Sequence, residues 1–228
     1  MRRVRARAEG LVRRAASARQ VLIERTAAVH RRIPDGSVAL TFDDGPQPGS
    51  TDVILNLLAE LDVRATFFCV GKNALAHPEL VQRMVAEGHA VGSHSLTHPH
   101  PAETTITKLS REYVAGRSAV AEASGSEPTL FRPPHGHLGL ASAALVRQCR
   151  FQTWLWTVDP YDWRPGATAE EIAAVAGDAR SGDVVLLHDW VEQPWEPSAL
   201  DRSATVDALP AVVDRIRRRG LRLETARP

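Results

Sequence analysis

The chain contains very little cysteine. Its 228 residues include only Cys69 and Cys149, which lie far apart in the sequence and belong to no Cys-x-x-Cys pair. This excludes a disulfide framework and a cysteine-rich zinc site as the basis of the fold. Stability therefore has to come from a buried core.

Long apolar runs are missing as well. No stretch approaches the ~18 consecutive apolar residues that indicate a membrane-spanning helix. The hydrophobic fraction of 43% is nevertheless too high for a disordered chain, and neither repeats nor low-complexity tracts occur. The composition indicates an ordinary globular protein.

Lysine is nearly absent, and arginine supplies most of the positive charge. Ten arginines lie within residues 1–32 against only Glu9 and Glu24, which gives this segment a net charge of +8, whereas the remainder carries −7. The acidic remainder argues against nucleic-acid binding. We expect residues 1–34 to form a basic helical extension or a solvated tail, and residues 1–32 to contact an anionic membrane surface or an acidic partner.

The N-terminal segment also lacks the pattern of a secretory signal. Arg13, Arg14 and Arg19 interrupt the apolar stretch that such a signal requires after its first basic residues. We therefore expect the protein in the cytoplasm or at the cytoplasmic face of a membrane, with an extracellular location left open.

From residue 35 onward, short β-branched or aromatic runs alternate with longer Ala- and Leu-rich stretches. This alternation predicts one domain over residues 35–228 with about seven parallel strands joined by helices, as an open doubly wound sheet or a barrel. The predicted strands are 38–42, 64–70, 89–92, 129–131, 151–157, 183–187 and 221–224. The predicted helices are 51–61, 78–87, 103–123, 140–149, 169–180 and 206–219.

Polar side chains follow the ends of five of these predicted strands. In chain order they are Asp43 and Asp44, His94 and His98, Arg132, Asp159 and Asp162, and His188. The carboxyl ends of parallel strands converge on one face of a closed barrel, whereas an open sheet would not bring five of them to one point. The sequence therefore favours a (β/α) barrel with its active site on that face.

Two of these groups indicate a metal site. His94 and His98, four residues apart, would point to one side if the turn between them is helical, and two histidines with a carboxylate are a common site for catalytic zinc or another divalent metal. The adjacent Asp43 and Asp44 repel each other unless a cation compensates them or a proton is shared. Taken separately, the histidine pair could arise by chance, and the two aspartates could form an ordinary acidic turn.

Five motifs occur together and in order: TFDDGP at 41–46, HSLTH at 94–98, RPPHG at 132–136, DPYDW at 159–163 and LLH at 186–188. They resemble the motifs of the polysaccharide deacetylase family, also called the NodB homology domain or carbohydrate esterase family 4. The resemblance runs from about Ser37 to Glu224. It implies a distorted (β/α) barrel of about seven strands and a metal-dependent hydrolase that removes N-acetyl groups from N-acetylglucosamine units of a glycan or glycoconjugate.

The resemblance also implies a metal site. Asp44, His94 and His98 would hold a divalent ion, with zinc expected and cobalt or nickel as substitutes.

Further roles follow from the same resemblance. Asp43 would be the general base that takes a proton from the attacking water, and Arg132 would pair with Asp43 and keep it ionised. His188 would be the general acid that protonates the leaving amine. Asp159 would orient His188 and raise the pKa of its imidazole.

The remaining implied site residues face the substrate. The backbone N–H of His135 would donate to the oxyanion, with Pro133 beside it on the substrate side, although the family usually has tyrosine where His135 stands. Trp163 and Leu186 would form the apolar surroundings of His188.

A further stretch, residues 189–203, precedes the last predicted helix and contains Trp190 and Trp195. Their indole rings suit stacking on the C–H faces of sugars. Packing of one or both against the rim of the barrel is an equal alternative.

Two other functions fit the same motifs. One is O-deacetylation of an acetylated glycan such as xylan, and the other is a non-catalytic carbohydrate-binding relic of the fold. The sequence retains the base, the three metal ligands and the acid. This argues against the relic, because the loss of any one of these residues would be the simplest sign of a non-catalytic protein.

Overall fold

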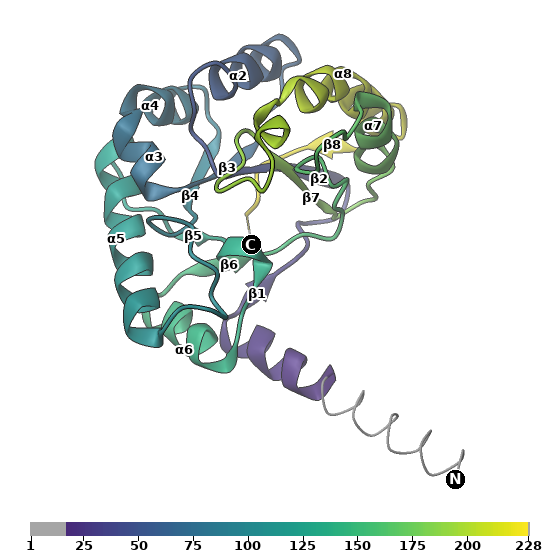
Figure 1. Ribbon diagram of the computed structural model, residues 1–228. Helices are drawn as coiled ribbons and strands as arrows, with labels where there is room; N and C mark the ends of the chain where they lie inside the picture. Colours follow the sequence, from purple (N-terminus) through teal and green to yellow (C-terminus); the bar gives the residue numbers. More distant parts are fainter. Residues whose placement is uncertain (1–16, 228) are drawn as a thin grey trace, which may run out of the picture.

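A sheet of seven strands in the order β1-β6-β5-β4-β3-β2-β7 forms the centre of the computed structural model, which describes residues 17–227 (Figure 1). An eighth strand, β8, pairs with β2 outside this path, and all the strand pairs are parallel. The strands are β1 (Val29–His30), β2 (Ser37–Asp43), β3 (Thr66–Cys69), β4 (Ala90–Ser93), β5 (Leu130–Phe131), β6 (Gln152–Trp154), β7 (Val184–His188) and β8 (Arg222–Leu223). The prediction of an α/β fold with about seven parallel strands is confirmed.

Helices cover the outer side of this sheet (Figure 1). They are α2 (Thr51–Glu60), α3 (Gly71–Ala76), α4 (Pro78–Ala86), α5 (Ile106–Ser124), α6 (Leu140–Gln148), α7 (Ala169–Gly177) and α8 (Ser203–Arg218). Two short 3-10 turns, η1 (Pro134–Gly136) and η2 (Pro197–Leu200), lie in loops. All six predicted helices are present, whereas α3, with only six residues, had not been predicted.

The sheet forms a barrel that is only partly closed, because isolated contacts, and not a continuous ladder, join the start of β7 to the segments that follow β1 and β6. Single bridges connect Arg32 with Asp183 and Val158 with Val185. The N–H of Ile33 also donates to the carbonyl of Gly182. Although the barrel is not fully closed, the carboxyl ends of its strands lie on one face.

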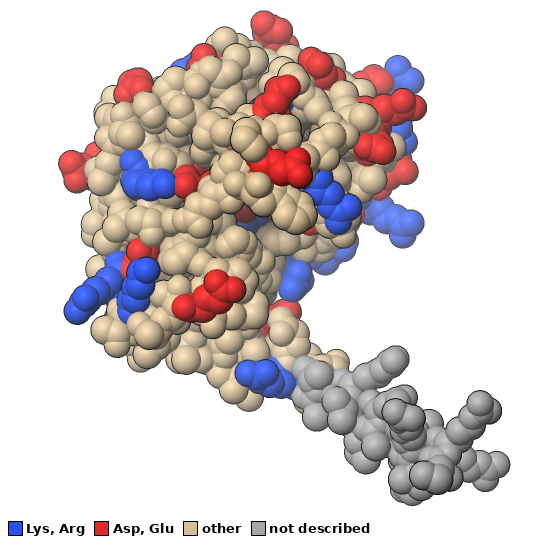
Figure 2. Space-filling model, viewed as in Figure 1, with Lys and Arg blue, Asp and Glu red and all other residues tan. Residues whose placement is uncertain are grey.

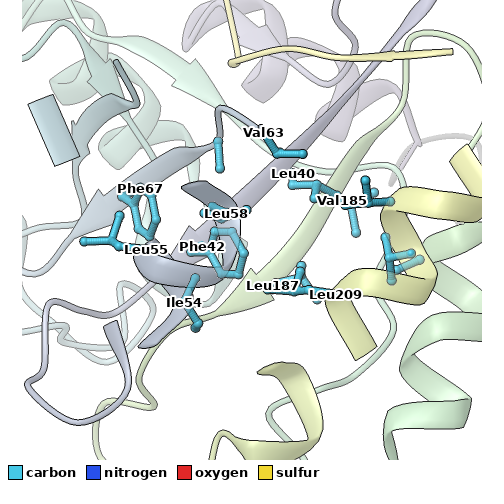
Figure 3. Close-up of a cluster of buried hydrophobic side chains, with 14 of the residues drawn as sticks. Leu40, Phe42, Ile54, Leu55, Leu58, Val63, Phe67, Val185, Leu187 and Leu209 are labelled. Carbon is cyan, nitrogen blue, oxygen red and sulfur yellow. The ribbon is translucent and has the colours of Figure 1, made fainter. Parts of the chain in front are cut away.

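Strand β2 shows how alternation builds the two sides of the barrel wall. Leu40 and Phe42 point outward into a cluster with residues of α2, β7 and α8 (Figure 3). Thr41 and Asp43, on the opposite face of the strand, contact the buried Arg132 inside the barrel. The strand period of two thus separates the hydrophobic core from the polar interior.

The barrel begins earlier in the chain than the sequence suggested. Residues 17–26 are helical, and Ile23 and Ala27 are buried against the core near α6. β1 pairs with β6, so the boundary predicted between residues 34 and 35 falls inside the packed structure. β1 precedes the alternation of strand-like and helix-like runs from which the other strands are predicted, so no sequence pattern marks it.

Part of the predicted basic extension, residues 1–16, lies outside the described residues. Within 17–227, no helix combines the length and apolar character needed to cross a membrane. On the face seen in Figure 2, basic and acidic side chains are intermingled.

Candidate active site

A cleft of about 580 Å³ opens at the carboxyl ends of the strands, within the ~300–1,000 Å³ usual for ligand pockets. Nine predicted site residues line it: Asp43, Asp44, His94, His98, His135, Asp159, Trp163, Leu186 and His188. Arg132 is fully buried and contacts the cleft through Asp43. Pro133 is buried before η1 and does not line the cleft, which contradicts its predicted place beside the substrate.

Asp44 faces the two histidines of the HSLTH motif. Its Oδ1 lies 3.4 Å from Nε2 of His94 and 3.4 Å from Nε2 of His98, and all three residues are buried. Among the described residues, they form the one group of side chains arranged to share a metal ion. Asp44 Oδ1 is buried and has no hydrogen-bond partner, an arrangement that is costly unless a cation occupies the site.

The spacing of these atoms fits a divalent metal. Two donors at ~2.0–2.2 Å from a tetrahedral zinc ion lie about 3.4 Å apart, which matches the separations of Asp44 Oδ1 from both histidine nitrogens. A divalent cation held by Asp44, His94 and His98 would lower the pKa of a water molecule and polarise the carbonyl under attack.

Hydrogen bonding prepares His94 as a ligand. Its Nδ1 lies 2.6 Å from the carbonyl oxygen of Arg132, and because a carbonyl can only accept, Nδ1 carries the hydrogen and Nε2 offers its lone pair toward Asp44. Burial lowers the pKa of His94 well below its usual value and that of His98 to about 4. Both imidazoles are therefore neutral near pH 7, as metal binding requires.

The histidines converge through a loop and not through the helical turn considered from their spacing. Ser95 and His98 have positive φ values of 67° and 58°, and the His98 N–H donates to Ser95 Oγ at 3.1 Å. Glu112 of α5 accepts from both the N–H and the hydroxyl of Thr97, each at 2.9 Å. This loop bends both imidazoles back toward Asp44.

Asp43 is held by a buried arginine. Arg132 Nη1 donates to Asp43 Oδ1 at 2.6 Å and to Thr41 Oγ1 at 2.9 Å, and its guanidinium lies 4.2 Å from the ring centre of Phe68. Burial raises the pKa of Asp43 to about 6, against the lowering effect of Arg132. Asp43 thus keeps its charge at neutral pH while its second oxygen stays directed toward the metal site, 3.6 Å from Nε2 of His94.

His188 is oriented by Asp162. Its Nδ1 lies 2.8 Å from Asp162 Oδ1, and its backbone N–H donates to Asp162 Oδ2 at 2.9 Å. Asp159 accepts instead from the N–H of Tyr161 at 2.8 Å, so its predicted role in orienting His188 is wrong. Burial lowers the pKa of His188, but Asp162, Asp44 and Asp43 together raise it to about 9.

His135 lies at the exposed side of the cleft, on η1. Its φ of 57° places it in the left-handed region, and its ring lies beside that of His98, with a centroid separation of 4.6 Å and the two ring planes tilted by 53°. The hydrogen bonds within this turn use the N–H groups of Gly136 and His137. The next residue must be glycine, because a Cβ on Gly136 would meet the ring of Trp156.

Sequence reasoning missed two supporting groups near Asp44. The backbone N–H of Glu192 donates to Asp44 Oδ2 at 2.8 Å, a contact that no sequence signal could reveal. The carboxylate of Asp189, which directly follows His188, accepts from the N–H of Gly45 at 3.1 Å and from the hydroxyl of Thr51 at 2.6 Å. For the second group, the available sequence signal was an aspartate directly after a predicted catalytic histidine.

The fold and the site together define a class of protein: hydrolases that use a divalent metal at the carboxyl ends of a parallel barrel. Residues 30–154 match the family model described as polysaccharide deacetylase. The chain is 34% identical over 207 residues to a peptidoglycan-N-acetylglucosamine deacetylase of Bacillus cereus, covering 89% of this chain and 93% of that protein. It is 36% identical over 192 residues to a chitooligosaccharide deacetylase of Bradyrhizobium sp., covering 82% and 87%.

A solved structure agrees with these similarities. The crystal structure of the Bc1960 peptidoglycan N-acetylglucosamine deacetylase aligns with a TM-score of 0.79 at 31% identity, covering 89% of this chain and 92% of that one. This chain belongs to the polysaccharide deacetylase family. The resemblance drawn from the five motifs and the expectation of a carbohydrate-deacetylating enzyme are confirmed.

Proposed function

We propose that this chain is a zinc-dependent N-deacetylase that hydrolyses the acetamide of N-acetylglucosamine units in an oligosaccharide, polysaccharide or glycoconjugate. The observation that carries this proposal is the meeting of a base, three metal ligands and an acid around one cleft. A carbohydrate-binding relic would have no need to keep all of them together. The relatives named above act on amino sugars, which supports the substrate class.

In the proposed reaction, Asp43 removes a proton from the water that attacks the acetamide carbonyl carbon. Arg132 keeps the carboxylate ionised and fixes its direction through the 2.6 Å contact. The backbone N–H of His135 is the proposed donor to the oxyanion that forms on the carbonyl oxygen.

Breakdown of the tetrahedral intermediate requires a proton on the departing nitrogen, because an amine anion is a very poor leaving group. His188 supplies this proton from Nε2, while its Nδ1 stays bonded to Asp162. The carbon–nitrogen bond breaks, acetate leaves and the free amine remains on the sugar. A pKa of about 9 keeps His188 protonated at neutral pH, as this step demands.

O-deacetylation is the second candidate, because the same groups attack an ester more readily than an amide. An alcohol leaves with less help from an acid than an amine does. The contact with Asp162 and the raised pKa keep His188 protonated, so a proton is available for a departing amine. This favours the amide as the substrate.

Purified protein incubated with N-acetylglucosamine oligomers or acetylated xylan, with zinc or with chelator, tests the proposal by mass spectrometry of acetyl loss. We expect zinc-dependent loss from the amino sugars and a decrease of about 10²–10⁴-fold in Asp43→Asn. Metal analysis of Asp43→Asn serves as the control, because this variant keeps all three ligands. Loss from xylan alone would assign the esterase, and loss from neither would contradict a deacetylase on these glycans.

We also propose that residues 1–32 contact an anionic membrane surface at the cytoplasmic face. The +8 charge of this segment supports the proposal, as does the exposure of Val21 and Leu22, each 54%, on the helical segment 17–26. Co-sedimentation with phosphatidylglycerol vesicles should fall in Val21→Ser/Leu22→Ser. The matched control, Val175→Ser on α7, changes another exposed valine and should bind like the native chain. Equal binding to neutral phosphatidylcholine vesicles would contradict an electrostatic contact.

A further inference from the structure

Trp195 is the most exposed large apolar side chain in the described part of the protein, with 77% of its surface accessible. Single exposed apolar residues are ordinary on protein surfaces. Trp195 differs because it lines the same cleft as Asp43 and His188. A flat apolar ring thus stands at the edge of a cleft whose reacting groups are polar.

The segment that carries Trp195 is anchored to the metal site. Glu192 donates its backbone N–H to Asp44 Oδ2 at 2.8 Å. Its carboxylate accepts from Lys72 Nζ at 2.5 Å and from Asn73 Nδ2 at 3.1 Å, at the start of α3. Asn73 in turn donates to the carbonyl of Asp44 at 2.8 Å. The loop is therefore tied at its base to the backbone and to the side chain of a metal ligand.

Further contacts restrict the loop close to the indole. The side-chain amide of Gln193 donates to the carbonyl of Thr97 at 3.2 Å, across the cleft. Pro194 immediately precedes Trp195, and Pro197 follows two residues later. Proline fixes its own φ, so little backbone freedom is left to lose when a ligand binds. The backbone that carries the indole of Trp195, called the platform below, is therefore restrained before any ligand binds.

The depth of the cleft sets what can reach this platform. Leu186, only 3% exposed, and His188 lie at its buried end, whereas Trp195 lies at its solvent edge. An acetamide placed between Asp43 and His188 occupies the buried end. A ligand that also covers the Trp195 ring must continue outward, and in a glycan the next group outward is the neighbouring sugar.

We propose that Trp195 stacks on the sugar ring adjoining the one that is deacetylated, so that the enzyme prefers oligosaccharides to the single sugar. This inference rests on the proposed function. The C–H face of a pyranose is an apolar plane of the kind that aromatic rings pack against. Trp190 has a different place: it lines a separate hollow with Pro48 and Leu200 and takes no part in the platform.

Calorimetric binding to zinc-loaded Asp43→Asn protein tests the platform without turnover. N-acetylglucosamine and its tetramer are titrated into this protein and into the same protein carrying Trp195→Ala, Trp195→Phe or Glu196→Ala. Glu196 is the matched control, because it is exposed on the same loop but does not line the cleft. Thermal midpoints verify that each variant is folded.

We expect Trp195→Ala to reduce the ratio of tetramer to monomer affinity about five- to tenfold. Trp195→Phe should restore most of this ratio, and Glu196→Ala should leave it unchanged. An unchanged ratio in Trp195→Ala, or an equal loss in Glu196→Ala, would overturn the proposal.

Acetate release by proteins that retain Asp43 separates this inference from the proposed function. If acetate is released from the tetramer but the ratio of tetramer to monomer affinity does not depend on Trp195, the platform is contradicted and the proposed catalysis stands. Binding that depends on Trp195 without acetate release from any oligomer contradicts the proposed catalysis and leaves the platform standing.

Discussion

At the scale of single residues, the adjacent carboxylates Asp43 and Asp44 differ in what surrounds them. Asp43 receives a hydrogen bond from Arg132, whereas Asp44 turns one oxygen to two imidazoles and the other to the N–H of Glu192. Burial raises the pKa of each to about 6. Asp44 has a left-handed φ of 79°, and both carboxylates reach the same atom, Nε2 of His94, at 3.6 Å from Asp43 and 3.4 Å from Asp44.

Asp162, and not Asp159, holds the imidazole of His188, so its charge should affect how the reaction depends on pH. Asp162→Asn removes a negative charge 2.8 Å from His188, so the pKa of this histidine falls from about 9 toward its ordinary value of 6.5. His188 then loses its proton at lower pH, and we expect kcat to decrease and the alkaline limb of the kcat profile to move to lower pH. Deacetylation rates measured between pH 6 and pH 10 provide the test.

Asp159→Asn is the matched control for this prediction. Asp159 lines the cleft but has no hydrogen bond to His188, so its substitution should leave the alkaline limb in place. A shift in Asp159→Asn that equals the shift in Asp162→Asn would contradict the assignment.

The same pair also affects stability. The pKa of His188 is higher in the folded state than its ordinary value of 6.5, so protonated His188 stabilises the fold below that pH. This contribution is lost as the pH rises through about 9.

The DPYDW motif shows where prediction from sequence stops. Both aspartates follow the same strand, and nothing in their spacing tells which of them reaches His188. Tyr161 lies between them with a φ of 58°, and this left-handed residue reverses the chain so that Asp162 turns inward. The order of the motifs was sufficient to predict the family, whereas this choice depended on one backbone angle.

At the scale of elements, helix α5 supports the loop that carries the two metal-binding histidines. Gly116 lies so close to this loop that a Cβ there would overlap the backbone of Ser95 and Leu96. One turn earlier, Glu112 accepts two hydrogen bonds from Thr97. The helix therefore fixes the path of the chain between His94 and His98.

Gly116→Ala should weaken both stability and metal binding. The added methyl group has to displace backbone atoms, and we expect a loss of about 1–3 kcal/mol in the free energy of unfolding. Because the displaced segment joins His94 to His98, zinc affinity should fall as well. Denaturant unfolding and zinc titration measure the two effects.

Ser118→Ala provides the control, because Ser118 is exposed on the same helix. It should change neither quantity. A destabilised Gly116→Ala protein with native zinc affinity would show that α5 does not govern the geometry of the site.

Most elements were predictable because, from residue 35 onward, short β-branched or aromatic runs alternate with longer Ala- and Leu-rich stretches. The exceptions were β1, with two residues, and α3, with six. α3 begins where Gly71 packs against Gly116 and Ala119 of α5, so tertiary contact and not local sequence defines it. Short elements of this kind depend on neighbours that the sequence does not identify.

At the scale of the whole molecule, the N-terminal part completes the barrel. Arg32 donates to Asp183 beside β7 at 3.0 Å, and the ring of His30 stacks on Trp154 of β6 with a centroid separation of 5.0 Å. Ile23 and Ala27 extend the core on the same side. These contacts come from residues that the sequence had assigned to a separate extension.

A chain that starts at residue 35 should consequently be much less stable than one that starts at residue 17. The shorter chain loses β1 together with the buried Ile23, Ala27 and Ile33, and burial of each large aliphatic side chain contributes about 1.5–3 kcal/mol. We expect a lower thermal midpoint or insoluble protein. Comparison of the two by calorimetry and circular dichroism gives the answer, and equal midpoints would mean that the barrel is complete without β1.

Asp44 and His94 are about 50 residues apart along the chain, yet their facing atoms are separated by 3.4 Å. An ion held between them is therefore a cross-link from the end of β2 to the end of β4. Closing a loop of that length in an unfolded chain opposes binding by about 4 kcal/mol of chain entropy. In the folded barrel the hydrophobic core already holds the two strand ends close together, so the ion binds the native state selectively. Its binding stabilises the sheet reversibly.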